Sequence, residues 1–394
     1  MRRGARMAAG LLLLLAGAAW WTTGAGATWV GLAASLVLGT VGLTLLLARA
    51  PRLAGLATAA AGGAVAVVFG LALHGHLRGE RPYEGRGLAA ALPSDGLAVR
   101  PTVGAAPAFP AAGGEPLRLI AWGDCRGGVT VFERLLDAVR ARRPHAVVGL
   151  GDFVGMARVH AFEVLRDKIQ GTGVPTWLVP GNHDLDPWDA LGPYGEVLGA
   201  GGWAFVARDV LVVGLDSARG RLAPSEADRL ERLVAQAGPS ARHLVVCVHH
   251  PLWAPPGRED KPLPQGAPET RRVQAVCEAR GALVLCSHWH GYDRSSIGRA
   301  TQVVTGGAGS RLEADHPYHF LGIEFGDAGP TIERVDLAPA DFDTEGIDKL
   351  KTFRDEASWA ARELPLRTLA PWAGLVALLA GLVTALRPRS RRPA

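Results

Sequence analysis

The first 77 residues contain no acidic residue, no lysine and no cysteine. Apart from two histidines, the ionisable residues there are five arginines: Arg2, Arg3, Arg6, Arg49 and Arg52. Four more arginines close the chain: Arg387, Arg389, Arg391 and Arg392. Without these nine arginines, 33 of the 42 basic residues remain, and all 37 acidic residues lie in the same part of the chain. Residues 78–386 therefore carry a slightly negative net charge. The pI of 9.3 therefore does not indicate a nucleic-acid-binding protein, and we expect no nucleic-acid partner.

Cysteine is also scarce, with four in 394 residues. Cys125, Cys247 and Cys286 lie in or beside short apolar runs, where free cysteine is common as a small hydrophobic residue. We expect no essential disulfide. Cys247 with Cys286 is the pair most worth checking, because both lie shortly before candidate ligands on strands that could be neighbours. The hydrophobic content of 48% excludes intrinsic disorder and a collagen-like fibre as the main class.

Long uncharged runs occur at both ends of the chain. The segment 7–48 has no charged residue, and as a helix it would be about twice as long as the roughly 30 Å hydrocarbon core of a bilayer. It predicts two transmembrane helices with a turn near residues 22–28. Residues 53–73 predict a third helix, and residues 368–386 a fourth. The alternative for the first segment is a cleaved signal peptide, because the basic residues 1–6 precede a short apolar core.

The arginine clusters set the expected orientation, because cytoplasmic loops retain Lys and Arg near membrane ends. Four spans place all three clusters inside, which makes both termini and the basic tail 387–394 cytoplasmic. Residues 78–367 would then lie outside the cytoplasm in a multi-pass membrane protein. Cleavage of the first segment would not change this orientation.

The part between the spans divides by composition. Residues 78–116 are rich in Gly, Ala and Pro, which predicts a linker. Short apolar runs then alternate with amphipathic segments, as in an α/β domain. The predicted strands are 117–122, 146–150, 176–179, 210–215, 244–248 and 282–286, followed by antiparallel strands at 302–305, 320–325 and 331–335. The predicted helices are 129–142, 159–170, 225–237 and 269–280. The domain is expected to span 117–338, with a long ordered loop at 251–268 and a helical connector at 339–367.

Five of the strands are each followed at once by a polar cluster. In chain order the clusters are GDCRGG at 123–128, GDF at 151–153, GNHD at 181–184, HHP at 249–251 and SHWH at 287–290. Loops at the carboxyl ends of strands in an open α/β sheet converge on one edge, so the clusters can share one crevice. Carboxylate, carboxamide and imidazole groups together suit hard to borderline divalent ions.

The order and spacing of these clusters resemble those of the calcineurin-like metallophosphoesterases over residues 117–335. The resemblance implies a four-layer α/β/β/α sandwich. It also implies two divalent metal ions (Mn, Fe or Zn), and a metal-bridging hydroxide that attacks the phosphorus atom of a phosphate mono- or diester. By the resemblance, Asp152 bridges the two ions. The ligands of one ion are Asn182, His249 and His288, and those of the other are Asp124 and His290. His183 is the implied acid for the leaving group, with Asp184 orienting its ring.

One position departs from that family's pattern. The first cluster usually contains Asp-x-His, but here the third residue is Arg126, whose guanidinium stays protonated and has no lone pair for a metal. A compensating tyrosine three residues after the bridging aspartate is also absent, because Gly155 stands there. The first metal site should therefore be weaker. Arg126 is expected either to bind substrate phosphate in a fork or to form a structural salt bridge.

Simpler interpretations exist for single residues. Asp and Asn favour turns, and Asp124 can be explained as a helix cap. His250 is expected to lie behind the metal ligands, Asp216 to fix a turn, and Trp289 either to flank the cleft or to pack in the core. Taken together, the ordered clusters favour the metal site.

The sequence thus favours a membrane-tethered, metal-dependent phosphoesterase. An alternative is a catalytically degenerate metal- or phosphate-binding membrane protein. A membrane scaffold or sensor is a third class, but the spans lack Asp, Glu and Lys, which indicates anchors. The substrate is a phosphorylated compound, and its class is left open among lipid phosphates, lipid-linked diphosphates, nucleotides and phosphoproteins.

Overall fold

The computed structural model describes residues 101–110, 114–188, 190–237, 241–313 and 315–363. The four predicted transmembrane segments lie outside these ranges, so they stay predictions. Among the described helices, none has both the length and the hydropathy needed to cross a bilayer. Residues 101–352 belong to one compact unit, which is the unit described below.

The first sheet has five strands in the order β11-β10-β1-β2-β3. Its parallel part consists of β1 (Leu117–Trp122), β2 (Ala146–Gly149) and β3 (Thr176–Leu178). The late strands β10 (Tyr318–Gly326) and β11 (Gly329–Ala338) extend it as an antiparallel hairpin beside β1. The parallel strands are almost wholly apolar, as expected of strands that are covered on both faces.

The second sheet has six strands in the order β4-β5-β6-β7-β9-β8. Parallel pairing joins β5 (Val210–Gly214), β6 (His243–Cys247), β7 (Leu283–Cys286) and β9 (Ala300–Thr305). The edge strands β4 (Trp203–Ala207) and β8 (Tyr292–Ile297) pair antiparallel with their neighbours. Neither edge strand was predicted: β8 (YDRSSI) is mostly polar, whereas β4 (WAFVA) is an apolar run that was overlooked.

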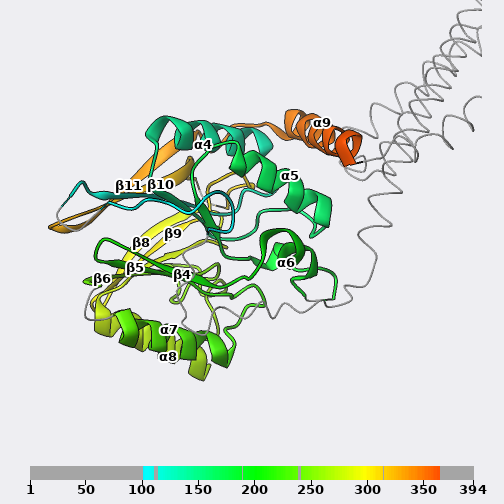
Figure 1. Ribbon diagram of the computed structural model, residues 1–394. Coiled ribbons are helices and arrows are strands. Elements are labelled where there is room, and N and C mark those ends of the chain that lie inside the picture. The colour runs from blue at the N-terminus through cyan, green and yellow to red at the C-terminus, as the bar shows by residue number, and fades with distance from the viewer. Residues whose placement is uncertain (1–100, 111–113, 189, 238–240, 314, 364–394) are drawn as a thin grey trace, which may run out of the picture. The chain divides into compact units, whose positions relative to one another are not determined.

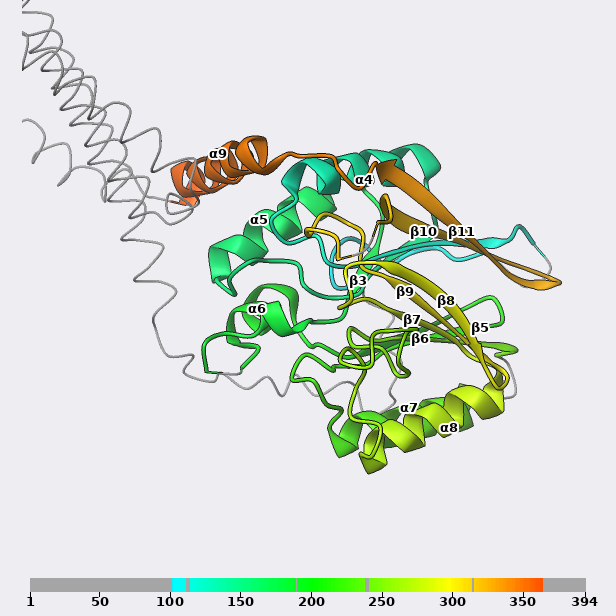
Figure 2. The ribbon, with the colours of Figure 1, turned by 180° about the vertical axis from the view of Figure 1, so that it is seen from behind.

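Helices cover the outer face of each sheet, which gives the predicted four layers (Figures 1 and 2). The first sheet is covered by α4 (Val129–Arg142) and α5 (Val159–Gln170), whose ends match the prediction. The second is covered by α7 (Pro224–Ala237) and α8 (Pro268–Arg280). A short helix that was not predicted, α6 (Gly192–Leu198), lies beside α5. The segment 251–268 contains no helix or strand before α8, as predicted.

The core between the sheets is built on aromatic side chains. Trp177 from β3 and Phe205 from β4 join the two sheets, with ring centroids 4.2 Å apart. Phe109 stacks on Phe205 at 5.2 Å, and Val103 forms a bridge with Thr176. Residues 101–110, which were predicted as part of a linker, instead pack against the domain.

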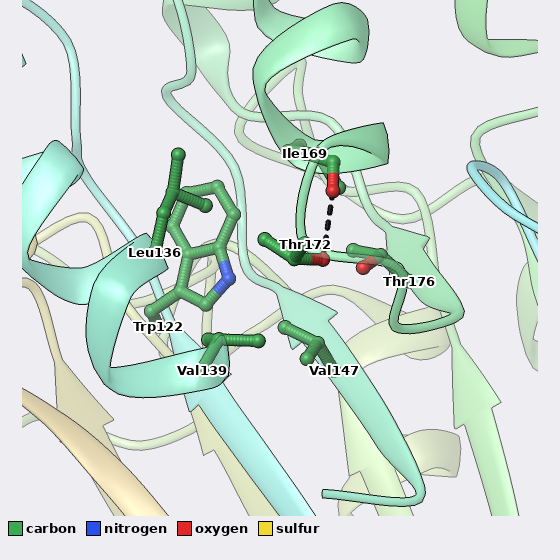
Figure 3. A pocket seen from close by; sticks show the side chains of 7 residues that line it. All are labelled: Trp122, Leu136, Val139, Val147, Ile169, Thr172 and Thr176. Carbon is green, nitrogen blue, oxygen red and sulfur yellow. Dashed lines mark hydrogen bonds between the residues drawn. The ribbon is translucent and has the colours of Figure 1, made fainter. Parts of the chain in front are cut away.

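A second packed region lies between α4, α5 and the first sheet. Figure 3 shows the space between Trp122, Leu136, Val139, Val147, Ile169, Thr172 and Thr176. This space does not admit a water molecule, and Trp122 and Val139 at its walls are buried. It is therefore core packing rather than a binding site.

Helix α9 (Glu345–Glu363) follows the sandwich in the chain, which confirms that the predicted connector 339–367 is helical over this range. It docks through polar residues: Asp348 is buried, and its Oδ1 accepts a hydrogen bond of 2.7 Å from the backbone N–H of Thr130 at the start of α4. Ile347 and Leu350 on the same helix are exposed. The contact with α4 thus provides a hydrogen-bond acceptor for the N-terminus of α4 and leaves two large apolar side chains of α9 uncovered.

Candidate metal centre

The five polar clusters meet at one edge of the sandwich, as predicted from their positions after the strands. Asp124 follows β1, Asp152 follows β2 and Asn182 follows β3. From the second sheet, His249 follows β6, and His288 with His290 follows β7. Ligand atoms of Asp124, Asp152 and His249 lie within 4.8 Å of one another. Segments that are far apart in the sequence therefore supply a single site.

The backbone is strained where the ligands are presented. Asp124, Asp152 and His288 have positive φ angles of 58°, 57° and 67°, a region that costs non-glycine residues free energy and is enriched at functional sites. The glycines beside them are also needed. A Cβ on Gly181 would lie 2.3 Å from Oδ1 of Asp152, and one on Gly151 would lie 2.5 Å from Nδ1 of His249.

One group of lone pairs converges around His249. Its Nδ1 lies 2.8 Å from the carbonyl oxygen of Leu150, which can only accept, so Nδ1 carries the proton and Nε2 a free lone pair. That Nε2 faces Oδ1 of Asn182 at 3.1 Å and Nδ1 of His288 at 3.2 Å. His288 Nδ1 and Asn182 Oδ1 are 3.0 Å apart. Three electron-rich atoms at such distances suit a shared cation.

A second group forms around Asp124. Its Oδ2 accepts a 2.9 Å hydrogen bond from the N–H of His288, but its Oδ1 is buried without any hydrogen-bond partner. Nε2 of His290 is 3.6 Å from that Oδ1. The proton of His290 is on Nδ1, which lies 2.8 Å from the carbonyl of Arg311, so its Nε2 also presents a lone pair. An unpartnered buried carboxylate oxygen beside an imidazole lone pair fits a metal ligand.

Asp152 stands between the two groups. Its Oδ1 lies 3.4 Å from Nε2 of His249 and accepts a hydrogen bond from the N–H of His183. Its Oδ2 turns to the other side, toward Arg126 at 3.4 Å and His183 at 4.0 Å. A ligand atom of Asp152 also lies within 4.8 Å of those of Asp124 and His249, one from each group, and this position suits a carboxylate shared between two ions.

Burial keeps His249 and His288 neutral, as metal binding requires, whereas for His290 the effect of burial is outweighed by the Asp124 carboxylate, which raises the pKa of that ring. Burial lowers the pKa of His249 well below its usual value and that of His288 to about 2. Burial together with the neighbouring Asp152 charge raises the pKa of Asp124 to about 6. The carboxylates therefore repel one another here, and divalent cations would relieve that repulsion.

His183 and Asp184 have different environments. His183 reaches into the site, and burial lowers its pKa. Asp184 is wholly buried and accepts backbone N–H bonds from four residues: Asp152, Phe153, Val154 and Gly181. The prediction that Asp184 orients the ring of His183 was wrong, because these bonds occupy both of its oxygens. Asp184 instead holds the loops of Asp152 and Asn182 together.

Arg126 lies where the sequence comparison expected a metal-binding histidine. Its backbone N–H donates to the carbonyl of Asp152 at 3.2 Å, and its Nε is buried without a hydrogen bond. The side chain is 29% exposed, which leaves the rest of the guanidinium accessible from the site. The salt bridge with Asp152 and a contact with substrate phosphate are therefore compatible.

Three residues support the ligands, and of these only Ser287 was not predicted. Ser287 donates its hydroxyl to the Leu150 carbonyl at 2.6 Å and lies 3.0 Å from Nδ1 of His249, so it fixes that ring. His250 packs against the ring of His288 at 4.1 Å, behind the ligands as expected. Asp216 fixes a turn by accepting the N–H of Ala218. The supporting role of Ser287 could not be predicted from the sequence, because a serine that precedes a histidine is common and has no specific meaning.

Two further predictions concern packing. Trp289 is 8% exposed and belongs to the core cluster of the second sheet, which agrees with the packing alternative. All four cysteines are buried and free, including Cys247 and Cys286.

Comparison with known proteins agrees with this geometry. Residues 117–292 match the family model of the calcineurin-like phosphoesterases. No curated protein matches the chain significantly.

Several solved structures have a limited similarity to this chain. A purple acid phosphatase from yellow lupin (Lupinus luteus) seeds is 15% identical with a TM-score of 0.47, covering 62% of this chain and 56% of its own. This chain therefore spans little more than half of that relative. A dimetal phosphatase from Danio rerio is 12% identical with a TM-score of 0.41, covering 57% of this chain and 100% of its own. The GAP50 anchor of the Plasmodium inner membrane complex is 11% identical with a TM-score of 0.44, covering 61% of this chain and 95% of its own.

Proposed function

Residues 117–292 form a calcineurin-like phosphoesterase domain, and we propose that the chain uses it to hydrolyse a phosphate mono- or diester outside the cytoplasm while both chain ends anchor it in a membrane. The domain is that of a phosphate-ester hydrolase, and its Asp and His groups fit the two divalent metal ions of the family. Asn182, His249 and His288 would hold one ion, Asp124 and His290 the other, and Asp152 both.

The observation that supports this function best is the position of Asp152, which lies within 4.8 Å of ligand atoms of both Asp124 and His249, one from each group of lone pairs. When bound, two ions supply charge neutralisation for the phosphate and a nucleophile at neutral pH. The protein itself has to bind the phosphate oxygens and protonate the leaving oxygen. Arg126 can bind those oxygens with its accessible N–H groups.

His183 is the residue placed to protonate the leaving oxygen. Its Nε2 lies 4.0 Å from Oδ2 of Asp152, at the side of the site that also holds Arg126. Burial lowers the pKa of His183 in the free protein, but a phosphate anion beside the ring would raise it again. The imidazole would therefore gain its proton when substrate binds, which suits a general acid.

Membrane attachment is supported by the uncharged runs at both ends of the chain and by exposed apolar side chains. Met156 and Trp188 are 57% and 64% exposed, and they stand in the loops that follow the ligands Asp152 and Asn182. Together with Ile347 and Leu350 on α9, they offer apolar surface to a bilayer or to an amphiphilic substrate. We propose a lipid phosphate or lipid-linked phosphate as the substrate class.

The second candidate is a degenerate member that binds metal or phosphate without turnover. The observation in its favour is Arg126, a fixed cation in the place of a ligand. Retention of His183 within the site favours the enzyme, because a binding protein has no use for a leaving-group acid.

Hydrolysis by the full chain in detergent tests the function. Phenyl phosphate and bis(4-nitrophenyl) phosphate serve as monoester and diester, each with Mn²⁺ and with a chelator. Turnover of either ester that the chelator abolishes is expected. Folded protein that hydrolyses neither ester at saturating Mn²⁺ would support the degenerate binder.

Topology has its own test. A phosphatase or fluorescent reporter fused after Ala394 should report a cytoplasmic C-terminus. A reporter that is active only outside the cytoplasm would contradict the four-span arrangement.

A further inference from the structure

We propose that a polar hollow beside the metal centre binds a second anionic group of the substrate, a phosphate or a carboxylate separate from the phosphate that is hydrolysed. This inference rests on the proposed function, since it concerns the substrate of the same site. The hollow has a volume of about 370 Å³, which lies within the usual range for small-molecule sites. It is lined by Asp216, Arg219, Arg221, Ala223, Ser225 and Glu226.

The hollow lies on the same edge of the sandwich as the metal ligands. Its residues belong to the loop between β5 and α7 and to the first turn of α7, and β5 pairs in parallel with β6, which carries His249 at its end. Loops after adjacent parallel strands are neighbours at the carboxyl edge. A group bound in the hollow would therefore be close to the phosphate at the metal centre.

Contacts join the loop to the ligand cluster directly. The hydroxyl of Ser217 accepts the backbone N–H of His250 at 3.1 Å and lies 3.4 Å from its Nδ1. A Cβ on Gly220 would be 4.0 Å from Nε2 of His250. The ring of His250 in turn packs against that of His288. One imidazole thus separates the loop that lines the hollow from a metal ligand.

The carboxylates of the hollow are already paired within the protein. Oε2 of Glu226 accepts the N–H of Asp216 at 3.0 Å and lies 2.6 Å from the buried guanidinium of Arg229. Asp216 accepts the N–H of Ala218, and its other oxygen lies 3.8 Å from Arg219. Both carboxylates of the hollow therefore already have a guanidinium partner other than Arg221.

Arg221 is the remaining cation of the hollow. It is exposed at the hollow, and among the described residues no hydrogen bond or ion pair involves it. Guanidinium binds phosphate and carboxylate through paired N–H groups. The lining contains no large apolar side chain, so an acyl chain would gain little there, whereas an anionic group would find an unused partner.

Arg221→Gln in the full chain, kept in detergent, tests the inference. Arg232→Gln is the matched control, because it removes the same charge from an exposed position of α7 outside the hollow. Three substrates are compared: phenyl phosphate, 4-carboxyphenyl phosphate and benzene-1,4-diyl bisphosphate. For the last two, Arg221→Gln should lower kcat/KM about tenfold, the expected loss of a charged hydrogen bond. Phenyl phosphate should change less than about twofold, as should all three substrates with the control.

The two doubly anionic substrates distinguish the sources of the second charge. A larger loss with the bisphosphate identifies a phosphate as the natural group, and a larger loss with the carboxyl compound identifies a carboxylate. An equal loss with phenyl phosphate, or no loss with any substrate, would overturn the proposal.

A binding measurement separates this proposal from the catalytic one. Calorimetric titration of inorganic phosphate into chelator-treated full chain requires neither metal nor turnover. The Arg221→Gln variant should bind phosphate about tenfold more weakly than the Arg232→Gln control. Equal binding by the two variants would refute the hollow as an anion site, even if the domain proves to be an active hydrolase.

Discussion

The Nε atom of Arg126 lies 3.4 Å from Oδ2 of Asp152, the carboxylate oxygen that does not face His249. A permanent positive charge therefore stands beside the ligands of one ion, where the family's usual pattern would place an imidazole. Like charges at such short range repel strongly where water is partly excluded. The first ion, held by Asp124 and His290, should bind more weakly than the second.

Arg126→His should strengthen that first ion, because it removes the repulsion and adds a lone pair. We expect its affinity to rise by about tenfold or more, measured by titration with Mn²⁺ and elemental analysis. Arg126→Gln is the control that removes the charge without adding a ligand, and it should give a smaller gain. If neither variant differs from the wild type, the guanidinium does not oppose the ion.

His183→Ala should leave the metal content intact and lower kcat by about 10² to 10⁴. The reason is that its ring is placed to deliver a proton, while only its backbone N–H contacts Asp152 Oδ1. The loss should be smaller for an ester with an acidic leaving group, such as 4-nitrophenyl phosphate, than for phenyl phosphate. An equal loss with both esters would argue against a general acid.

Asp184→Ala should behave differently, because its carboxylate accepts backbone N–H groups from both ligand loops. Removing it leaves buried donors unsatisfied, and we expect the free energy of unfolding to fall by about 3 kcal/mol. Metal affinity should fall as well, since Asp152 and Asn182 lose their common support. Denaturant unfolding and metal analysis check both effects, with His183→Ala as the neighbouring control. Stability equal to that control would mean that the four bonds contribute little.

The two ions should differ in their dependence on pH. Burial together with the Asp152 charge raises the pKa of Asp124 to about 6, so protons compete with the first ion below that pH. Its affinity should fall by up to about tenfold per pH unit there. The imidazoles of the second ion have pKa values lowered by burial, to about 2 for His288, so they stay available. Metal titrations between pH 7.5 and 5.0 would contradict this if both affinities fell in parallel near 6.5.

The strands, helices and candidate ligands could be predicted from the sequence where neighbouring residues alone determine them. The ends of α4 and α5 follow from their apolar spacing, and the ligand clusters follow strands whose carboxyl ends must meet. The edge strand β8 gave no apolar signal, because an edge strand is paired on one side only and can be mostly polar, whereas the apolar run of β4 was overlooked. Residues 101–110 were predicted as linker because Gly, Ala and Pro dominate there, yet Phe109 packs on the core.

The site was less predictable where it depends on three-dimensional contacts. The role of Asp184 is set by backbone N–H groups from another loop, which no spacing reveals. The positive φ angles of Asp124, Asp152 and His288 are likewise imposed by the surrounding structure. The hollow at Arg221 depends on which carboxylates are already paired, and that is visible only when the loop and α7 are in place.

The bridging position of Asp152 is tested most directly by counting metal ions in the full chain at saturating Mn²⁺. The wild type should hold two ions, whereas Asp152→Ala should hold less than one and hydrolyse neither phosphate ester. Asp137→Ala, which removes a carboxylate from the exposed side of α4, should keep both ions. An Asp152→Ala protein that still binds two ions would contradict the bridge and the two-ion site built on it.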